Sequence, residues 1–258
     1  MHLIFIRHGD PDYKNDSLTE KGFREAELLS DRVSEWPIDN VYLSPYGRAQ
    51  KTAAPFLQKK KLDAVTLPWL KEFDTKIQDP RTKKLRGCWD WLPEDFYREG
   101  KYFDRKKWFK TKPMKKGGIK KRWLEVCNGM DEILESYGFE RRDLWTPIYS
   151  CKPHLSMEEA ATDTHLVANQ KDLDSRNLVF VCHLGVMFCI IAHLTGISPV
   201  QLWQGFFVAP TSVTVLSMEE RECGKAVFRV QSLGDASHLA KNGEKPSDSG
   251  FFGHTISL

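Results

Sequence analysis

The chain has 258 residues, of which 41% are hydrophobic and 12% aromatic, which is enough for one large core and excludes a disordered protein. Its net charge is +3, although residues 98–122 hold twelve Lys or Arg residues against two acidic ones. No signal-peptide pattern, no run of about 18 apolar residues and no regular spacing of the six cysteines is present, so we expect a cytoplasmic protein with reduced thiols.

The first third of the chain alternates between strand and helix patterns. Apolar runs and helical periodicity predict strands at 2–6, 40–43 and 65–67 and helices at about 18–34 and 46–60. Ser17 as N-cap and Glu20 three residues later would open the first helix with a capping box. This alternation predicts a three-layer α/β/α fold with a mostly parallel sheet.

Residues 74–118 interrupt that alternation, because Pro, Gly and aromatic residues replace the regular pattern. We expect a single domain in which this insertion, extending to about residue 150, caps the site. The remaining patterns predict helices at 119–137 (ended by Gly138), 156–169 and 185–194, and strands at 178–182, 211–218 and 226–233, the last two joined through 219–225.

Basic residues follow two of the predicted strands directly. Arg7, His8 and Gly9 come after the first strand, and His183 comes after the strand at 178–182. The carboxyl ends of strands are where α/β sheets bind ligands, and the planar guanidinium of arginine matches the geometry of phosphate. Arg48 falls in the first turn of a predicted helix, where free backbone N–H groups favour an anion. The pattern therefore indicates an anion site.

Four segments in order carry a resemblance to a known family: Arg7-His8-Gly9, residues 43–49 (LSPYGRA), residues 70–73 (LKEF) and residues 179–185 (VFVCHLG). Together they resemble the histidine phosphatase superfamily, in its phosphoglycerate mutase-like branch with the RHG motif. The tail at 234–239 looks like that of a bacterial subgroup. The resemblance implies a phosphoglycerate mutase-like α/β fold and phosphoryl transfer through a phosphohistidine.

The resemblance also implies a role for each motif residue. His8 would be the nucleophile, and His183 would bind phosphate and stabilise the transition state. Arg7 and Arg48, together with Gly9, would bind the phosphate oxygens.

Glu72 takes the position of the family's proton donor. Residues 74–77 (DTKI) stand where the family's phosphatases commonly have Gly-Trp-Glu-Gly, and Asp10-Pro11 replaces the familiar Glu-Thr. Asp10 is therefore the alternative acid, and His238 is a further candidate at the mouth of the site.

Several functions remain open at this point. The best supported is hydrolysis of a small phosphomonoester without a metal or cofactor, since Cys151 with His154, and Cys182 with His183, complete no four-ligand zinc pattern. The alternatives are a phosphoglycerate-type mutase, which must exclude water, and a non-catalytic phosphate-binding protein.

The basic segment 98–122, with its interleaved aromatic residues, has two interpretations. It would bind nucleic acid, or it would attract a substrate with more than one negative charge, such as a sugar phosphate or nucleotide; we favour the second. The aromatic-rich segments 89–109 and 203–207 could join two copies in a homodimer.

Overall fold

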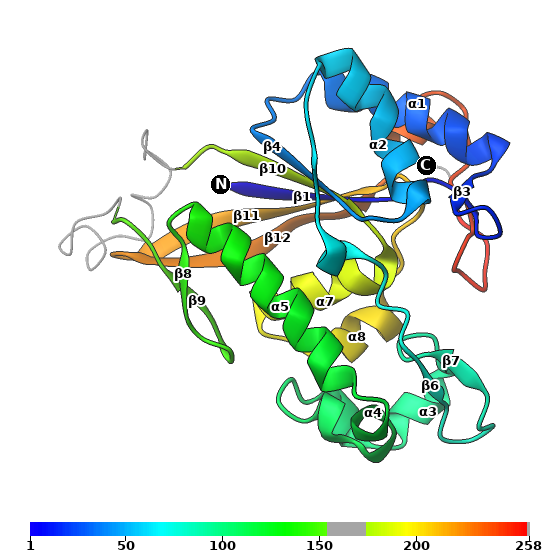
Figure 1. The fold of residues 1–258 in the computed structure, drawn as a ribbon, viewed down its shortest axis with the longest axis vertical. Helices are drawn as coiled ribbons and strands as arrows, with labels where there is room; N and C mark the ends of the chain where they lie inside the picture. The colour runs from blue at the N-terminus through cyan, green and yellow to red at the C-terminus, as the bar shows by residue number, and fades with distance from the viewer. Residues whose placement is uncertain (154–173, 257–258) are drawn as a thin grey trace.

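A twisted sheet of eight strands forms the centre of the molecule (Figure 1). The structure is a computed structural model that describes residues 1–153 and 174–256. The helix expected at 156–169 lies outside these residues. In spatial order the strands are β5 (Val65–Thr66), β4 (Asn40–Leu43), β10 (Asn177–Cys182), β1 (His2–Arg7), β11 (Val213–Glu222), β12 (Lys225–Asp235), β9 (Thr146–Ser150) and β8 (Glu140–Asp143).

The sheet is parallel in one half and antiparallel in the other. Strands β5, β4, β10 and β1 run parallel, whereas every pairing from β1 through β11, β12 and β9 to β8 is antiparallel. The predicted α/β fold is confirmed, but the sheet is mixed rather than mostly parallel. Two short turns account for two of the antiparallel pairings: only Cys223 and Gly224 separate β11 from β12, and only residues 144–145 separate β8 from β9. A turn this short joins only antiparallel strands.

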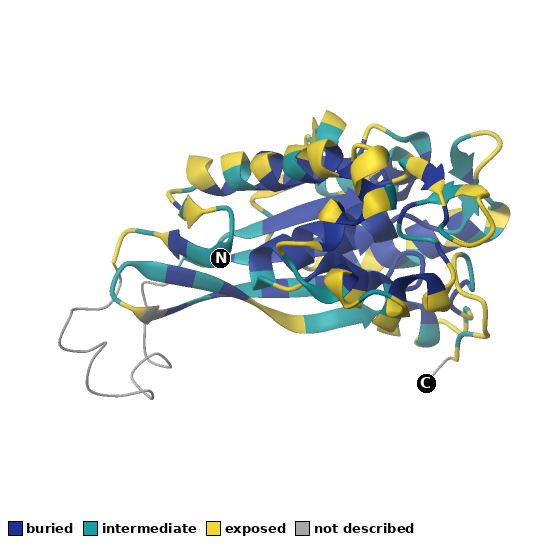
Figure 2. Ribbon diagram, turned by 90° about the horizontal axis from the view of Figure 1, so that it is seen from below, coloured by how far each residue is buried: buried dark blue, intermediate teal, exposed yellow. Residues whose placement is uncertain are grey.

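Helices cover both faces of the sheet, which gives the expected three layers (Figure 1). One face carries α1 (Glu20–Ser34), α2 (Gly47–Lys60) and the short α9 (Ser237–Ala240). The other carries α5 (Ile119–Ser136), α7 (Leu184–Thr195) and α8 (Pro199–Gly205). Successive residues of β1 point to opposite faces, so Leu3 and Phe5 join one core cluster and Ile4 and Ile6 the other. Figure 2 accordingly shows the central strands as buried and the outer surfaces of the helices as exposed.

Helix α1 begins differently from the prediction. Ser17 is not its N-cap, because Ser17 pairs with Asp12 in a small ribbon formed by β2 (Pro11–Asp12) and β3 (Ser17–Leu18). Thr19 caps the helix instead, and its hydroxyl oxygen accepts a hydrogen bond from the backbone N–H of Gly22 at 3.1 Å.

A 3₁₀ turn (Pro68–Leu70) precedes the insertion. The insertion itself consists of short elements: the hairpin of β6 (Lys76–Gln78) and β7 (Leu85–Gly87), the helices α3 (Pro93–Tyr97) and α4 (Lys112–Lys116), and the 3₁₀ turns Gly100–Phe103 and Trp108–Lys110. Its aromatic side chains Tyr102, Trp108 and Phe109 are buried in the core, and are therefore not available to stack on bases. Residues 140–150, which the sequence assigns to the cap, instead form β8 and β9 at the edge of the main sheet.

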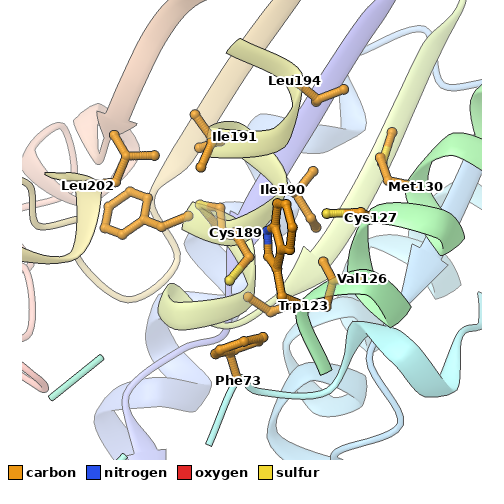
Figure 3. Packing of buried hydrophobic residues seen from close by; sticks show 14 of the residues in the cluster. Phe73, Trp123, Val126, Cys127, Met130, Cys189, Ile190, Ile191, Leu194 and Leu202 are labelled. Atoms are coloured by element: carbon orange, nitrogen blue, oxygen red, sulfur yellow. The ribbon is translucent and has the colours of Figure 1, made fainter. Parts of the chain in front are cut away.

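The core between α5 and α7 fixes the position of α7. Figure 3 shows Val126, Cys127 and Met130 of α5 directed toward Cys189 and Ile190 of α7, and all five are buried. Helix α7 starts one residue after His183, so this packing also fixes the position of the backbone at His183.

Candidate active site

His8 and His183 lie side by side because β1 and β10 are neighbouring parallel strands. Arg7 pairs with Cys182 in the sheet register, so the next residue of each strand emerges at the same edge. Their ring centroids are 5.0 Å apart, and both residues are buried. Strand β4 ends at the same edge, and α2 and α7 begin there. The segments that contain Arg7-His8-Gly9, Arg48 and His183 therefore lie together at one edge of the sheet, as the sequence predicts.

The ring of His8 is held in one tautomer. Its Nδ1 lies 2.7 Å from the carbonyl oxygen of Gly9. A carbonyl can only accept, so Nδ1 carries the proton and Nε2 keeps its lone pair. Burial, and then the positive charges of Arg7 and Arg48, hold the pKa of His8 well below its ordinary value. His8 is thus a neutral imidazole with a free lone pair, as a nucleophile requires.

His183 is hydrogen-bonded to Ser44. Its Nε2 lies 2.6 Å from Oγ of Ser44, and this oxygen accepts the backbone N–H of Tyr46 at 3.2 Å. If the Ser44 hydroxyl donates to Nε2, the proton of His183 lies on Nδ1, and if Nε2 donates to Oγ, Nδ1 keeps its lone pair. That Nδ1 is buried without a hydrogen-bond partner in the described part of the chain. The sequence motif contains Ser44 but assigned it no role.

Two arginines complete a cationic pocket. Arg7 is 3% exposed and donates from its two terminal nitrogens to the carbonyl oxygens of Val208 and Ser249, at 2.7 and 2.8 Å. Arg48 is 8% exposed and donates from Nη1 to Oδ1 of Asp16 at 2.8 Å. The Nε atoms of both arginines are buried and have no partner within residues 1–153 and 174–256. Such fixed guanidinium groups with unused donors suit a dianion.

Asp16 is a site residue that sequence analysis missed. Its Oδ2 accepts the backbone N–H of Gly47 at 2.6 Å, at the first residue of α2. The helix N-terminus predicted to receive an anion therefore already holds a carboxylate of the chain itself. A methyl group at position 47 would collide with the backbone oxygen of Asp16, which explains the glycine there.

Glu72 lies at the N-terminus of α7, next to the two histidines. It accepts backbone N–H groups from Phe73 at 2.6 Å, Val186 at 2.9 Å and Gly185 at 3.2 Å. Burial raises its pKa above the ordinary value, although these three donors and Arg7 oppose the rise. A Cβ atom at position 185 would come within 2.7 Å of Oε1 of Glu72, so only glycine leaves room for the carboxylate.

Arg7, His8, Arg48 and Glu72 line one pocket of about 570 Å³, which we call the phosphate pocket. His183 is not among its lining residues, although its ring lies beside that of His8. The complete lining is Arg7, His8, Tyr13, Asp16, Tyr46, Arg48, Glu72, Asp74, Lys76, Trp89, Asp90, Leu184 and Gly250.

Asp10 and His238 are not among the lining residues. Oδ2 of Asp10 accepts the Thr19 hydroxyl at 2.7 Å, and its other oxygen accepts the hydroxyl of Ser247. Nε2 of His238 lies 3.2 Å from Oγ1 of Thr211. Both therefore lie in hydrogen-bonded contacts around the pocket, and neither is oriented into it. Gly9 supports the site through its backbone, whose N–H donates to Oγ1 of Thr52 at 2.9 Å.

The basic segment 98–122 also contributes no lining residue to the phosphate pocket. Lys112 and Lys116 line a separate groove, together with Lys76 and Lys83. Lys76 is the residue that the two cavities share.

The C-terminal segment is the second contribution that sequence analysis missed. Besides the Ser249 carbonyl bound to Arg7, Gly250 lines the phosphate pocket with a φ of 83°, a conformation that favours glycine. A Cβ there would lie 3.2 Å from a terminal nitrogen of Arg7. The one signal in the sequence is the glycine itself, followed by Phe251 and Phe252.

Within the described ranges, no three His, Cys, Asp or Glu side chains are grouped as metal ligands, and no helix is long and apolar enough to cross a membrane. All six cysteines are free thiols.

Comparisons with known proteins agree with this geometry. Among curated proteins, the chain is 29% identical over 90 residues to the probable phosphoglycerate mutase GpmB of Proteus mirabilis, a match that covers 31% of this chain and only 42% of that protein.

Among solved structures, phosphoserine phosphatase of Entamoeba histolytica in complex with 3-phosphoglyceric acid has a TM-score of 0.57 at 16% identity, with 92% of this chain and 98% of that chain covered. Alpha-ribazole phosphatase of Shigella flexneri has a TM-score of 0.54 at 20% identity, with 92% and 97% covered. At these identities the likeness shows the fold alone. The model of the histidine phosphatase superfamily (branch 1) matches residues 3–105 and 129–230, so this chain belongs to that superfamily.

Proposed function

We propose that the protein is a phosphatase that hydrolyses a small phosphomonoester through a phosphohistidine on His8. The observation that carries the proposal is that two buried arginines, Arg7 and Arg48, line one pocket with His8. The Nε atoms of both arginines have no partner among the described residues, yet a buried donor without a partner is costly. A phosphate group bound by the two guanidinium groups would satisfy them.

The first half of the reaction forms the intermediate. The lone pair of His8 Nε2 attacks phosphorus, and the bond from phosphorus to the leaving oxygen breaks. The carboxyl proton of Glu72 passes to that oxygen, which is consistent with the raised pKa of Glu72. Arg7 and Arg48 neutralise the charge on the remaining phosphate oxygens, and His183 donates a hydrogen bond to one of them from Nδ1 in the tautomer that carries its proton there. Burial and the nearby positive charges hold the pKa of His183 well below its ordinary value, so it acts as a neutral donor.

The second half releases phosphate. Glu72, now a carboxylate, takes a proton from water while the water oxygen attacks phosphorus and the bond to Nε2 breaks. Inorganic phosphate leaves, and His8 and Glu72 return to their initial protonation states. Because the chain's own cations supply the charge, we propose that no metal or cofactor is needed. The six free thiols suit the reducing cytoplasm, where we place the reaction.

The test is phosphate release from a panel of phosphomonoesters in the presence of EDTA, comparing the wild type with His8→Ala. The matched control is His2→Ala, at the opposite end of the same strand. We expect turnover in the wild type and the control and none in His8→Ala. Equal turnover in His8→Ala would overturn the assignment of the nucleophile.

A mutase is the second candidate, and the match to GpmB favours it. The same preparation incubated with 3-phosphoglycerate separates the two, because a mutase would produce 2-phosphoglycerate faster than inorganic phosphate. If the protein neither releases phosphate nor converts 3-phosphoglycerate, but still binds inorganic phosphate, a non-catalytic phosphate-binding protein would be favoured.

A further inference from the structure

A second cavity of about 470 Å³ adjoins the phosphate pocket, and we call it the aromatic groove. Three separate parts of the chain form it: residues 86–93 of the insertion, residues 203–207 at the end of α8, and residues 250–253 near the C-terminus. Leu184 also lines it. The groove therefore exists only in the folded chain.

Exposed apolar side chains gather around this groove. Phe252 is 95% exposed, Phe206 is 50% exposed, and Phe251 and Leu92 are also exposed. Phe251 stacks on Phe207 with ring centroids 4.7 Å apart, which holds the C-terminal segment against the end of α8. Large apolar side chains left together in water commonly mark a binding site.

The groove lies against the phosphate pocket. Trp89, Asp90, Leu184 and Gly250 line both cavities. The two cavities are therefore immediate neighbours along these four residues.

Trp89 shows which part of a substrate would enter the groove. A Cβ at position 185 would lie 2.7 Å from Oε1 of Glu72 and 2.8 Å from Nε1 of Trp89, so the carboxylate and the indole are immediate neighbours. In the proposed mechanism Glu72 gives its proton to the leaving oxygen. The carbon skeleton attached to that oxygen then begins beside Trp89, at the entrance of the groove.

The charge in the groove is balanced. Arg86 and Asp90 are the charged residues in its lining, and Arg86 also lies 3.6 Å from Asp79. Arg86 is the one cation that the described residues place in the lining and is already paired with Asp79, whereas the cluster of lysines lines the other groove.

On the basis of the proposed function, we propose that the aromatic groove binds the leaving group of the substrate, and that this group is uncharged and apolar, with a planar ring system. The substrate class is then a phosphomonoester of an aryl-bearing alcohol rather than a molecule with several negative charges.

The experiment compares ethyl phosphate with naphthylethyl phosphate, two alkyl esters whose leaving groups have similar chemical reactivity. We expect kcat/KM to be at least about 100-fold higher for the naphthylethyl ester, because the ring system would leave water for the groove. Phe252→Ala and Phe206→Ala should each lower this ratio several-fold. Phe23→Ala, which removes an exposed aromatic ring from α1, is the matched control and should leave the ratio unchanged.

Each outcome has a defined meaning. Hydrolysis of both esters with a ratio near one overturns the groove proposal and leaves the proposed function intact. If neither ester is hydrolysed, the panel of phosphomonoesters decides the proposed function, and the ratio of the two esters' dissociation constants in His8→Ala decides the groove proposal by the same criterion. A wild-type dimer that Phe252→Ala converts to a monomer would show that a second copy of the chain occupies the groove, which also overturns the proposal.

Discussion

Replacing Glu25 by Gln should remove a loss of stability that the wild type suffers as the pH rises toward neutrality. Glu25 is fully buried on α1, and its Oε2 accepts the backbone N–H of Asp10 at 2.8 Å. Its Oε1 has no hydrogen-bond partner in the described chain, and Nζ of Lys21 lies 3.9 Å away. Burial is the main cause that raises the pKa of Glu25 from 4.5 to about 7.

The sign follows from which state holds the proton more tightly. The folded protein keeps the proton up to about pH 7, whereas the unfolded chain releases it near 4.5. The folded state is therefore penalised progressively as the pH rises through this window, and the full penalty is present above about 7. A pKa raised by this amount corresponds to about 3 kcal/mol of unfolding free energy.

Urea unfolding at about pH 4 and about pH 8 measures this effect. At each pH we subtract the unfolding free energy of the wild type from that of Glu25→Gln. The change in this difference between the two pH values is the informative quantity, because any effect of the amide that does not depend on pH cancels. We expect the variant to gain about 3 kcal/mol relative to wild type at the higher pH. Glu27→Gln, an exposed substitution on the same helix, controls for net charge. A change below about 1 kcal/mol would refute the reasoning.

Three further predictions concern the phosphate pocket. Ser44→Ala should lower kcat about tenfold with little change in KM, because His183 loses the hydrogen-bond partner that holds its tautomer, and Ser44→Thr should restore the rate; no rescue would mean a purely structural role. Glu72→Gln should lower kcat at least about 100-fold and abolish the fall of the wild-type rate as the pH rises through the raised pKa of Glu72; a retained alkaline limb would assign the acid elsewhere. Asp16→Asn should tighten inhibition by inorganic phosphate several-fold at low salt, because the carboxylate beside Arg48 would no longer repel the anion; weaker inhibition would mean that Asp16 mainly positions that arginine.

The sequence predicted those parts of the fold that depend on local patterns. The strands at 40–43 and 178–182 and the helices α2, α5 and α7 were predicted to within one or two residues, because apolar runs and helical periodicity determine them. Gly138, with a φ of 87°, follows α5 as expected for a terminating glycine.

The errors arose where distant contacts decide the structure. The N-cap of α1 was misassigned, because Ser17 pairs in a ribbon that no local pattern indicates. Asp16 lies 32 residues from Arg48 in sequence, and Ser249 lies 242 residues from Arg7, so neither partner could be read from spacing. His8 and His183 were predictable because each follows an apolar strand, and parallel strands bring their carboxyl ends together.

The strand-end residues that the sequence predicts and the C-terminal segment that it misses have different proposed roles: the first carry the reaction, and the second helps to select the substrate. The proposed phosphoryl chemistry depends on buried side chains at strand ends, such as His8 and His183, and altering them would leave polar groups unpaired in the interior. The proposed leaving-group site depends instead on the insertion and the C-terminal segment, where Phe252 is 95% exposed and contributes little to the core. Substitutions there change the shape of the groove at small cost in stability. Substitutions in the groove would therefore alter the proposed substrate preference without touching the phosphate pocket. The sequence motifs, which lie at the phosphate pocket, consequently indicate a phosphoryl-transfer reaction but not its substrate.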